Sequence, residues 1–313
     1  MRIVGIDVAK EKVDAAILSE EEHRTFMNSE PDRQEMLTWL QEKEIDVAVM
    51  EASGGYERQW AKLLHEGGLE VRVVNPTRVR NYARAAGRHA KNDRLDAEAI
   101  AAFGQAFDEP GQEFDEGVDD LEQLVNGQMR LKMLCVRLGN WQEHEAPAEL
   151  RAVYQALEAL LRDQLKRLTK VIASRIEHTE RFAERARIIE SVPGLGEGTA
   201  ASLIALLPEL GVASNKTIAA LAGVAPYDNQ SGSHNGPRSI AGGRRKVRNA
   251  LFMPTLGAAT QHNPVLKAYY NRLISTGKPP KAALIACMRK LIVILNTMIA
   301  RGETWDPTKH ELH

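Results

Sequence analysis

Short apolar runs alternate with polar turns along the first hundred residues. The runs RIVGIDVA and VDAAILS flank the charged turn KEK and predict a β-hairpin, with HRTFMNS as a candidate third strand. A helix over residues 31–43 has Ser29 as a cap-like residue at its start. DVAVMEA and LEVRVVNP then indicate buried strands on either side of a helix over 56–66. An antiparallel opening followed by strand–helix–strand alternation predicts an α/β fold with a mixed sheet over residues 1–107.

Helical periodicity dominates the rest of the chain. The acidic, turn-rich segment 108–120 is the expected linker, and the helical region 121–187 is expected to break into two long helices at Pro147. These helices form either a hairpin within one chain or a coiled coil between two chains, and the pattern favours neither. Residues 188–305 predict a mostly helical C-terminal domain that contains a glycine-rich, basic loop, DNQSGSHNGPRSIAGGRRKVRNAL. Residues 306–313 are expected to be a loose tail.

Composition places the chain among soluble globular proteins. The 313 residues carry a net charge of -1, so a basic surface can arise only from local segregation of Lys and Arg. The two cysteines are far apart and fit a reducing cytosol. The first residues carry charges where a signal peptide needs an apolar core. The late apolar segment AALIACMRKLIVILNTMIA has Arg289 and Lys290 at its middle, so we expect a buried helix, no membrane span and a cytoplasmic protein.

Carboxylates at three places in the first domain are candidates for chemistry. Asp7 lies within the first apolar run, Glu51 ends a later one, and Asp93 and Asp96 are three apart in the helical stretch KNDRLDAEAIA. Each has a bland explanation: a capping aspartate, an ion-pair partner, or a solvated helix face. Together they could hold two divalent cations of the kind that stabilise phosphoryl transfer.

Basic residues gather beside this acidic pair and favour contact with nucleic acid. A solvated helix face normally mixes both signs, whereas this run is almost wholly basic and suits phosphate neutralisation. The candidate contacts in the run are Arg78, Arg80, Arg84, Arg88, Lys91 and Arg94. The segment VPGLGEGTAASLIA, with Gly194 and Gly196, resembles a helix-hairpin-helix whose backbone N–H groups could meet a phosphate, although a plain glycine-capped turn explains it too.

Ser231 lies in the glycine-rich basic segment of the C-terminal domain. Clustered arginines can stabilise charge at a phosphate under serine attack, and the basic residues here are Arg238, Arg244, Arg245, Lys246 and Arg248. From spacing alone, a phosphate-binding loop is the simpler explanation, and Ser233, Ser239 and His234 compete for any catalytic role.

The motifs GIDVAKEKVDAAI, VMEASGGYE, KNDRLDAEAIA, VPGLGEGTAASLIA and LAGVAPYDNQSG occur in this order and resemble a bacterial transposase family. It is the insertion sequence one-hundred-and-ten family, also described as bridge-RNA-guided recombinases, and the resemblance runs from Arg2 to about Ala300. It implies an N-terminal RuvC-like domain of the RNase H fold with a D-E-D-D tetrad. Asp7, Glu51, Asp93 and Asp96 match that tetrad and would bind Mg²⁺.

The resemblance also implies how the C-terminal half acts. A coiled coil leads into a transposase domain whose nucleophilic serine matches Ser231, and this serine would attack a phosphodiester of double-stranded DNA. The carboxylate and serine halves of the site would come from different protomers of a homodimer or tetramer. A structured RNA encoded by the element would guide the protein to its target and donor DNA.

Three other functions remain alternatives. A metal-dependent nuclease or junction resolvase would use the carboxylates and give no role to Ser231. An actin-like ATPase or sugar kinase could use the first hairpin for phosphate, but it needs a second glycine-rich nucleotide motif that has no clear match. A non-catalytic DNA-binding protein could use the helix-hairpin-helix alone, and it would leave the four carboxylates unexplained.

Overall fold

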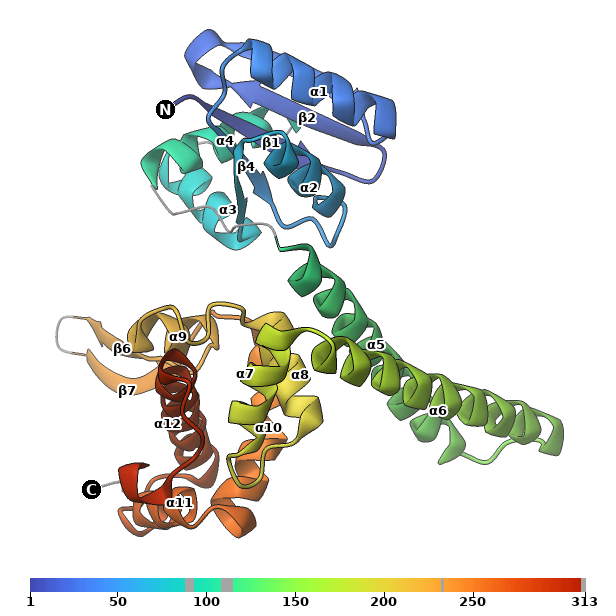
Figure 1. Cartoon of the computed structure of the whole chain (residues 1–313), viewed down its shortest axis with the longest axis vertical. Coiled ribbons are helices and arrows are strands. Elements are labelled where there is room, and N and C mark those ends of the chain that lie inside the picture. Colours follow the sequence, from blue (N-terminus) through green and yellow to red (C-terminus); the bar gives the residue numbers. More distant parts are fainter. Residues whose placement is uncertain (88–92, 108–114, 232–233, 311–313) are drawn as a thin grey trace. The chain divides into compact units, whose positions relative to one another are not determined.

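The computed structural model describes residues 1–87, 93–107, 115–231 and 234–310 (Figure 1). The side chains not described within these ranges are those of residues 93, 94, 229–231, 234, 235, 237 and 310. The chain divides into two compact units, Met1–Asp115 and Glu116–His313. Each unit has its own hydrophobic core.

A mixed five-stranded sheet forms the centre of the first unit. Its strand order is β3-β2-β1-β4-β5, with β1, β2 and β3 antiparallel in sequence and β1, β4 and β5 parallel. The strands are β1 (Ile3–Val8), β2 (Lys12–Ile17), β3 (Glu22–Met27), β4 (Val47–Glu51) and β5 (Glu70–Val74). The predicted hairpin, third strand and mixed sheet are confirmed, and the sheet fits an RNase H-like domain.

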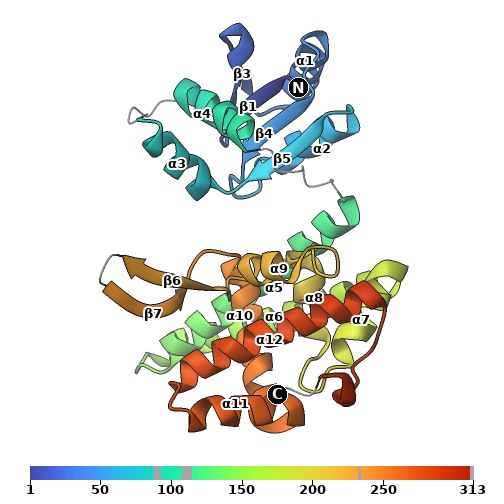
Figure 2. The ribbon, with the colours of Figure 1, turned by 90° about the vertical axis from the view of Figure 1, so that its left-hand side faces the viewer.

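Helices cover both faces of this sheet (Figure 2). The helices are α1 (Glu30–Glu42), α2 (Arg58–Glu66), α3 (Pro76–Ala85) and α4 (Asp93–Ala106), with a 3₁₀ turn η1 (Leu18–Glu20) after β2. One face of the sheet, which includes Ile6 and Met50, packs with α1 and α2. The other, which includes Ile3 and Val49, packs with α3 and α4. The alternation of side chains along each strand produces these two layers.

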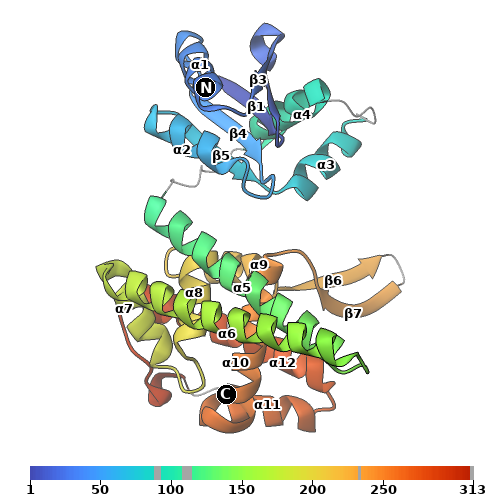
Figure 3. The same ribbon diagram turned by 90° about the vertical axis from the view of Figure 1, so that its right-hand side faces the viewer.

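Two long antiparallel helices open the second unit (Figure 3). α5 (Glu116–Gln142) and α6 (Ala148–Glu177) pack against each other within the chain, and the break between them falls at the predicted Pro147, which caps α6. The intramolecular hairpin is therefore the arrangement present here. Because α5 begins at Glu116, the last part of the expected linker is helical, while residues 108–114 of that linker lie outside the described ranges.

The remaining helices of the second unit enclose one core. They are α7 (Glu180–Glu190), α8 (Glu197–Leu206), α9 (Asn215–Leu221), α10 (Arg245–Gly257), a π-helical turn η2 (Ala258–His262), α11 (Pro264–Ser275) and α12 (Pro280–Arg301). Within the described part of the chain, α12 is the one helix long and apolar enough to cross a membrane. Its apolar side chains, among them Leu291 and Leu295, are buried in the core, as expected for a core helix.

Two features of the second unit differ from the sequence prediction. The glycine-rich segment predicted as a loop contains a β-hairpin, β6 (Pro226–Ser231) and β7 (His234–Ile240), because its backbone groups pair across the two strands. The segment after α12 is also ordered where a loose tail was expected. Trp305 packs against the core and its backbone N–H donates to Ser191 Oγ at 2.8 Å, and Pro307–His310 forms a 3₁₀ turn.

Candidate active site

Asp7 lies near the end of β1, on the sheet face that α4 covers. Gly5 and Asp7 are two residues apart on one strand and therefore share a face. A Cβ atom on Gly5 would lie 2.2 Å from the backbone oxygen of Ala97 and 2.3 Å from the backbone nitrogen of Ala101. The backbone of α4 thus rests directly on β1, and only glycine leaves room for it.

The direction of α4 brings its first turn toward the end of β1. A Cβ atom on Gly104 would lie 2.5 Å from Cγ2 of Val49 and 3.4 Å from Cγ2 of Ile3, the residue that begins β1. Successive turns of α4 therefore pass from the end of β1 toward its start, so the helix runs antiparallel to the strand. Its first turn, which starts at Asp93, consequently approaches Asp7.

The two aspartates of α4 occupy positions that continue its sheet-facing side. Asp96 precedes the buried Ile100 by four residues, and Asp93 precedes the buried Ala97 by four. Residues four apart share a helix face. Asp96 is half-buried, whereas the side chain of Asp93 lies outside the described part of the chain. The backbone therefore places both positions on the side of α4 that packs on the sheet.

Glu51 ends β4 on the same face as Asp7. β1 and β4 pair in parallel with Ile6 beside Met50, so the next positions along the two strands are Asp7 and Glu51. Val49 belongs to the core under α4, and Glu51, two residues later, shares its face. Both carboxylates are half-buried. The carboxyl ends of two neighbouring parallel strands thus bring Asp7 and Glu51 to the edge that the first turn of α4 approaches.

We call Asp7, Glu51, Asp93 and Asp96 the carboxylate site. An all-oxygen set of this kind suits hard divalent cations such as Mg²⁺ or Mn²⁺. Among the described residues, no three Asp, Glu, His or Cys side chains lie close enough together to hold an ion. The site therefore fits a divalent cation in residue type and in backbone placement, while its described side chains do not form a coordination shell.

Asp14 is a buried carboxylate beside this site that the sequence analysis missed. It pairs with Asp7 across β1 and β2, so both lie on the face covered by α4, and Asp14 is only 4% exposed. Thr25 Oγ1 donates to its Oδ1 at 2.6 Å. His23 Nε2 lies 3.1 Å from the same oxygen, although it is not aligned for a hydrogen bond. The available signal was an aspartate at the centre of an otherwise apolar strand, VDAAI.

Glu57 is a second missed carboxylate, and it fixes the loop that follows Glu51. Its side chain is 8% exposed, and its Oε2 accepts from Ser53 N at 3.0 Å, Ser53 Oγ at 2.8 Å and Gly55 N at 2.8 Å. Gly54 and Gly55 have φ of 80° and 115°, which favour glycine. This buried carboxylate therefore gives the SGG turn one shape directly beside the carboxylate site.

Ser231 is the last residue of β6, in the second unit. It pairs with His234 across the β6–β7 hairpin, and the hairpin projects from the helical body of its own unit (Figure 2). A register shift between Tyr227 and Asn229 marks an irregularity earlier in the same strand. The serine backbone thus stands at the end of a strand pair, a defined position that the predicted loop would not supply.

Both halves of the chain match models of transposases. Residues 4–142 match a transposase model of the DEDD IS110 type, and residues 186–271 match a model described as transposase of the IS116/IS110/IS902 family. The chain belongs to this transposase family. The expected resemblance is thereby confirmed, and the protein is an enzyme of DNA transposition and recombination. Membership in a DEDD family implies a DNA substrate and the use of a divalent metal ion.

Curated relatives have a related activity in their names. The pilin gene-inverting proteins of Moraxella bovis and Moraxella lacunata are each 28% identical to this transposase over 324 residues. In both comparisons the match covers 98% of this chain and 98% of the relative. The similarity therefore extends through both units and is not confined to the carboxylate domain.

The basic run of the transposase before α4 is only partly described. Arg78, Arg80 and Arg84 are exposed residues of α3. The guanidinium of Arg78 lies over the rings of Phe103 and Phe107, at 5.3 and 5.8 Å from their centroids, so aromatic packing holds its position. The predicted contacts Arg88 and Lys91, and the side chain of Arg94, lie outside the described residues. The role of this run in nucleic-acid binding stays a prediction.

Several predicted phosphate contacts of the second unit have partners within the chain. Arg244 forms a two-pronged pair with Glu209 at 2.7 and 2.5 Å and also donates to the backbone oxygen of Leu206. Lys246 Nζ donates to Asn126 Oδ1 at 2.8 Å. These side chains fasten the start of α10 to neighbouring elements, which gives them a structural role whether or not they also meet a phosphate.

Two more arginines of the basic cluster also bond within the chain, and a third is exposed. Arg248 donates to the backbone oxygens of Gly223 and Gly242, both at 3.1 Å. Arg238 pairs with Asp228 across the β6–β7 hairpin at 2.5 Å. Arg245 is exposed at the start of α10. The sequence could not separate these positions, because each partner lies elsewhere in the chain.

The turn between α7 and α8 contains the two glycines predicted to meet a phosphate. Gly194 has φ of 96°, and a Cβ atom there would lie 2.8 Å from Cβ of Ala258, so its conformation and packing both require glycine. Gly196 caps α8, and Glu197 follows it. Burial and the nearby charge of Glu197 raise the pKa of Glu190 above its ordinary value. These acidic groups near the turn weaken its attraction for a phosphate.

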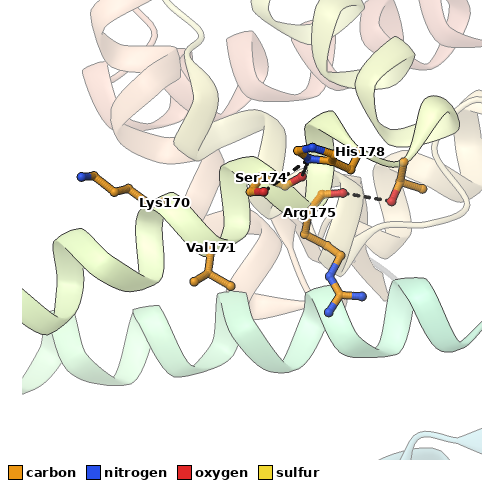
Figure 4. A pocket seen from close by; sticks show the side chains of 6 residues that line it. Lys170, Val171, Ser174, Arg175 and His178 are labelled. Carbon is orange, nitrogen blue, oxygen red and sulfur yellow. Dashed lines mark hydrogen bonds between the residues drawn. The ribbon is translucent and has the colours of Figure 1, made fainter.

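A shallow surface depression on α6 does not belong to the carboxylate site. Lys170, Val171, Ser174, Arg175 and His178 line it together with Thr179 (Figure 4). His178 Nδ1 lies 2.7 Å from the backbone oxygen of Ser174, and Thr179 Oγ1 donates to that of Arg175 at 2.9 Å. Its polar groups thus largely serve the last turns of α6.

Proposed function

We propose that this transposase cuts and rejoins DNA through Ser231, with the carboxylate site binding Mg²⁺ close to the reacting phosphate. The observation that carries the carboxylate half is the convergence of β1, β4 and the first turn of α4 on one edge of the sheet. The match of residues 186–271 to the second transposase model supports the serine half, because this range contains the β6–β7 hairpin.

The proposed chemistry is two successive transesterifications. Ser231 Oγ forms a bond to phosphorus as the bond from phosphorus to one deoxyribose oxygen breaks; that oxygen leaves as a hydroxyl, and the serine proton is transferred away. A hydroxyl from the exchanged strand then attacks the phosphoserine, restoring a phosphodiester and freeing the serine. The number of phosphate ester bonds is unchanged, so no nucleotide cofactor is required. A bound divalent ion would supply electrostatic stabilisation of the phosphate oxygens.

We propose that the two halves of the site come from different protomers of a dimer or tetramer. An apolar stripe on α6 supports self-association, because it lies beside the stripe that packs on α5 and is itself exposed. Its members recur at spacings of three, four and seven residues or their sums, as in a coiled-coil seam. They are Leu150, Val153, Leu157, Leu160 and Val171. A second copy of the chain would bury this stripe.

We further propose that a structured RNA encoded by the mobile element pairs with target and donor DNA. The exposed arginines of α3 support nucleic-acid contact in general, without deciding between RNA and DNA. Sequencing the RNA that copurifies with the full-length protein from cells that carry the whole element tests this step. An enriched transcript with short matches to both the element end and the insertion site is the expected result, and random cellular RNA alone would overturn it.

A donor and target plasmid assay tests the serine and metal halves separately. Ser231→Ala should abolish recombination and the covalent protein–DNA adduct seen on a denaturing gel, whereas Ser239→Ala, on the partner strand, should retain both. Asp96→Asn should also abolish recombination. If Ser231→Ala still recombined the plasmids, the serine mechanism would be wrong and a metal-dependent nuclease or resolvase activity would take its place. A fully active Asp96→Asn protein would refute the metal role.

A further inference from the structure

Lys12 lies on the same sheet face as the carboxylate site, one row farther out. Along β2, residues 12, 14 and 16 point to the face that α4 covers, whereas Val13 and Ala15 belong to the opposite core. Asp14 lies opposite Asp7, so Lys12 is the diagonal neighbour of Asp7 across the two strands. Diagonal neighbours lie within reach of a long side chain.

Asp14 holds the ammonium group of Lys12 above this face. Lys12 Nζ lies 3.7 Å from Asp14 Oδ2, while Thr25 donates to the other oxygen, Oδ1. A carboxylate buried this deeply needs compensating charge. Lys12 supplies it, and Asp14 in turn fixes where a positive charge stands beside Asp7.

The ammonium group nevertheless stays available to a ligand. The Lys12 side chain is 47% exposed, and its separation from Asp14 is too long for a hydrogen bond. An ammonium group has three donor protons and can serve a carboxylate and a second acceptor together. The acceptor that the carboxylate site is expected to receive is a phosphate oxygen of DNA, and lysine binds phosphate as a compact point charge.

We infer that Lys12 binds a backbone phosphate of the DNA at the carboxylate site and that Asp14 positions Lys12 for this contact. The inference rests on the proposed function, because it takes the carboxylate site as the place where DNA is processed. It gives roles to two residues outside the tetrad and explains why a buried aspartate stands opposite Asp7.

The salt dependence of DNA binding by the full-length protein tests the contact directly. A fluorescein-labelled duplex carrying the element end is titrated at several salt concentrations. Lys12→Gln should weaken binding about fivefold and lower the slope of log affinity against log salt by about 0.9, the value for one lost phosphate contact. Lys12→Arg should keep the slope, because it keeps the charge. An unchanged slope in Lys12→Gln would overturn the inference.

Lys62 offers a matched control on the opposite side of the sheet. It belongs to α2, its side chain is 39% exposed, and it lies 4.0 Å from Glu66, a pairing much like that of Lys12 with Asp14. Lys62→Gln should leave the slope and recombination at wild-type values. If Lys62→Gln lowered the slope as much as Lys12→Gln, the effect would reflect overall charge, and the assignment to Lys12 would fail.

A double mutant tests the positioning role of Asp14, and Asp96→Asn separates the two levels of the argument. If Asp14 acts through Lys12, then Asp14→Asn should reduce recombination in the wild-type background and add no further loss to Lys12→Gln. Additive losses would give Asp14 a separate role. An inactive Asp96→Asn protein beside a fully active Lys12→Gln protein overturns only the Lys12 assignment. An active Asp96→Asn protein overturns the proposed function itself.

Discussion

Replacing Gly5 with alanine should push α4 away from β1 and disable the carboxylate site. The new methyl would lie 2.2 and 2.3 Å from two backbone atoms of α4, whereas carbon contacts need about 3.5 Å, so the helix must move by about 1 Å. Overpacking of this kind costs about 1–3 kcal/mol, and we expect the upper end because helix backbone cannot rotate aside. A misplacement of about 1 Å at reacting groups can cost about 100-fold in rate.

Calorimetric unfolding and plasmid recombination measure the two consequences. The transition of the first unit should fall by roughly 10 °C in Gly5→Ala, as expected for about 3 kcal/mol in a domain of this size. Recombination should fall by about two orders of magnitude. Gly67→Ala is the matched control, because its Cβ would lie 2.3 Å from a terminal methyl of Leu37, which can rotate away.

Gly67→Ala should therefore lower the melting temperature by only a few degrees and retain recombination. If Gly5→Ala were as stable and active as Gly67→Ala, α4 could not rest on β1 as described. The placement of Asp96 near the carboxyl ends of β1 and β4 would then lose its support as well.

Three further predictions concern metal binding, the loop after β4 and pH. Mg²⁺ should relieve the repulsion among the carboxylates and raise the melting temperature of the wild-type protein, by about 1.4 kcal/mol of stability at ten times its Kd; equal shifts in wild type and Asp96→Asn would contradict this. Glu57→Ala leaves three loop donors without their acceptor and should cost roughly 2–4 kcal/mol in denaturant unfolding; a loss below about 0.5 kcal/mol would mean that the turn holds its shape alone. Because the pKa of Glu190 is raised in the folded state, its ionisation disfavours folding, and the wild type loses this stability as pH rises through that pKa. Glu190→Gln should accordingly melt higher than wild type at pH 7 and equally at pH 4, and a difference that does not change with pH would contradict the assignment.

The first unit was predictable from sequence because its signals are local. Alternating apolar residues in RIVGIDVA and VDAAILS define two strands, and the short turn between them defines their antiparallel pairing. The placement of Asp7 and Glu51 at strand ends follows from the same runs. Whether the polar row containing Asp14 faces water or a helix depends on where α4 packs, and strand alternation does not encode this. The role of Asp14 therefore emerged only with the fold.

The second unit was less predictable because its decisive contacts are distant in sequence. A basic run reads as a phosphate surface until Glu209, 35 residues before Arg244, is seen to pair with it. The β6–β7 hairpin lacks apolar alternation, since cross-strand backbone bonds define it more than side-chain burial does. Trp305 similarly signals a docked tail only when its partner Ser191 is known.

The separate cores of the two units have a genetic consequence. No core residue is shared between Met1–Asp115 and Glu116–His313, so a substitution that spoils the carboxylates need not disturb the fold around Ser231, and the reverse also holds. In an oligomer whose reactive centre is assembled from two chains, a chain defective in one unit can be complemented by a chain defective in the other. Two inactive alleles expressed together would then restore recombination that neither supports alone.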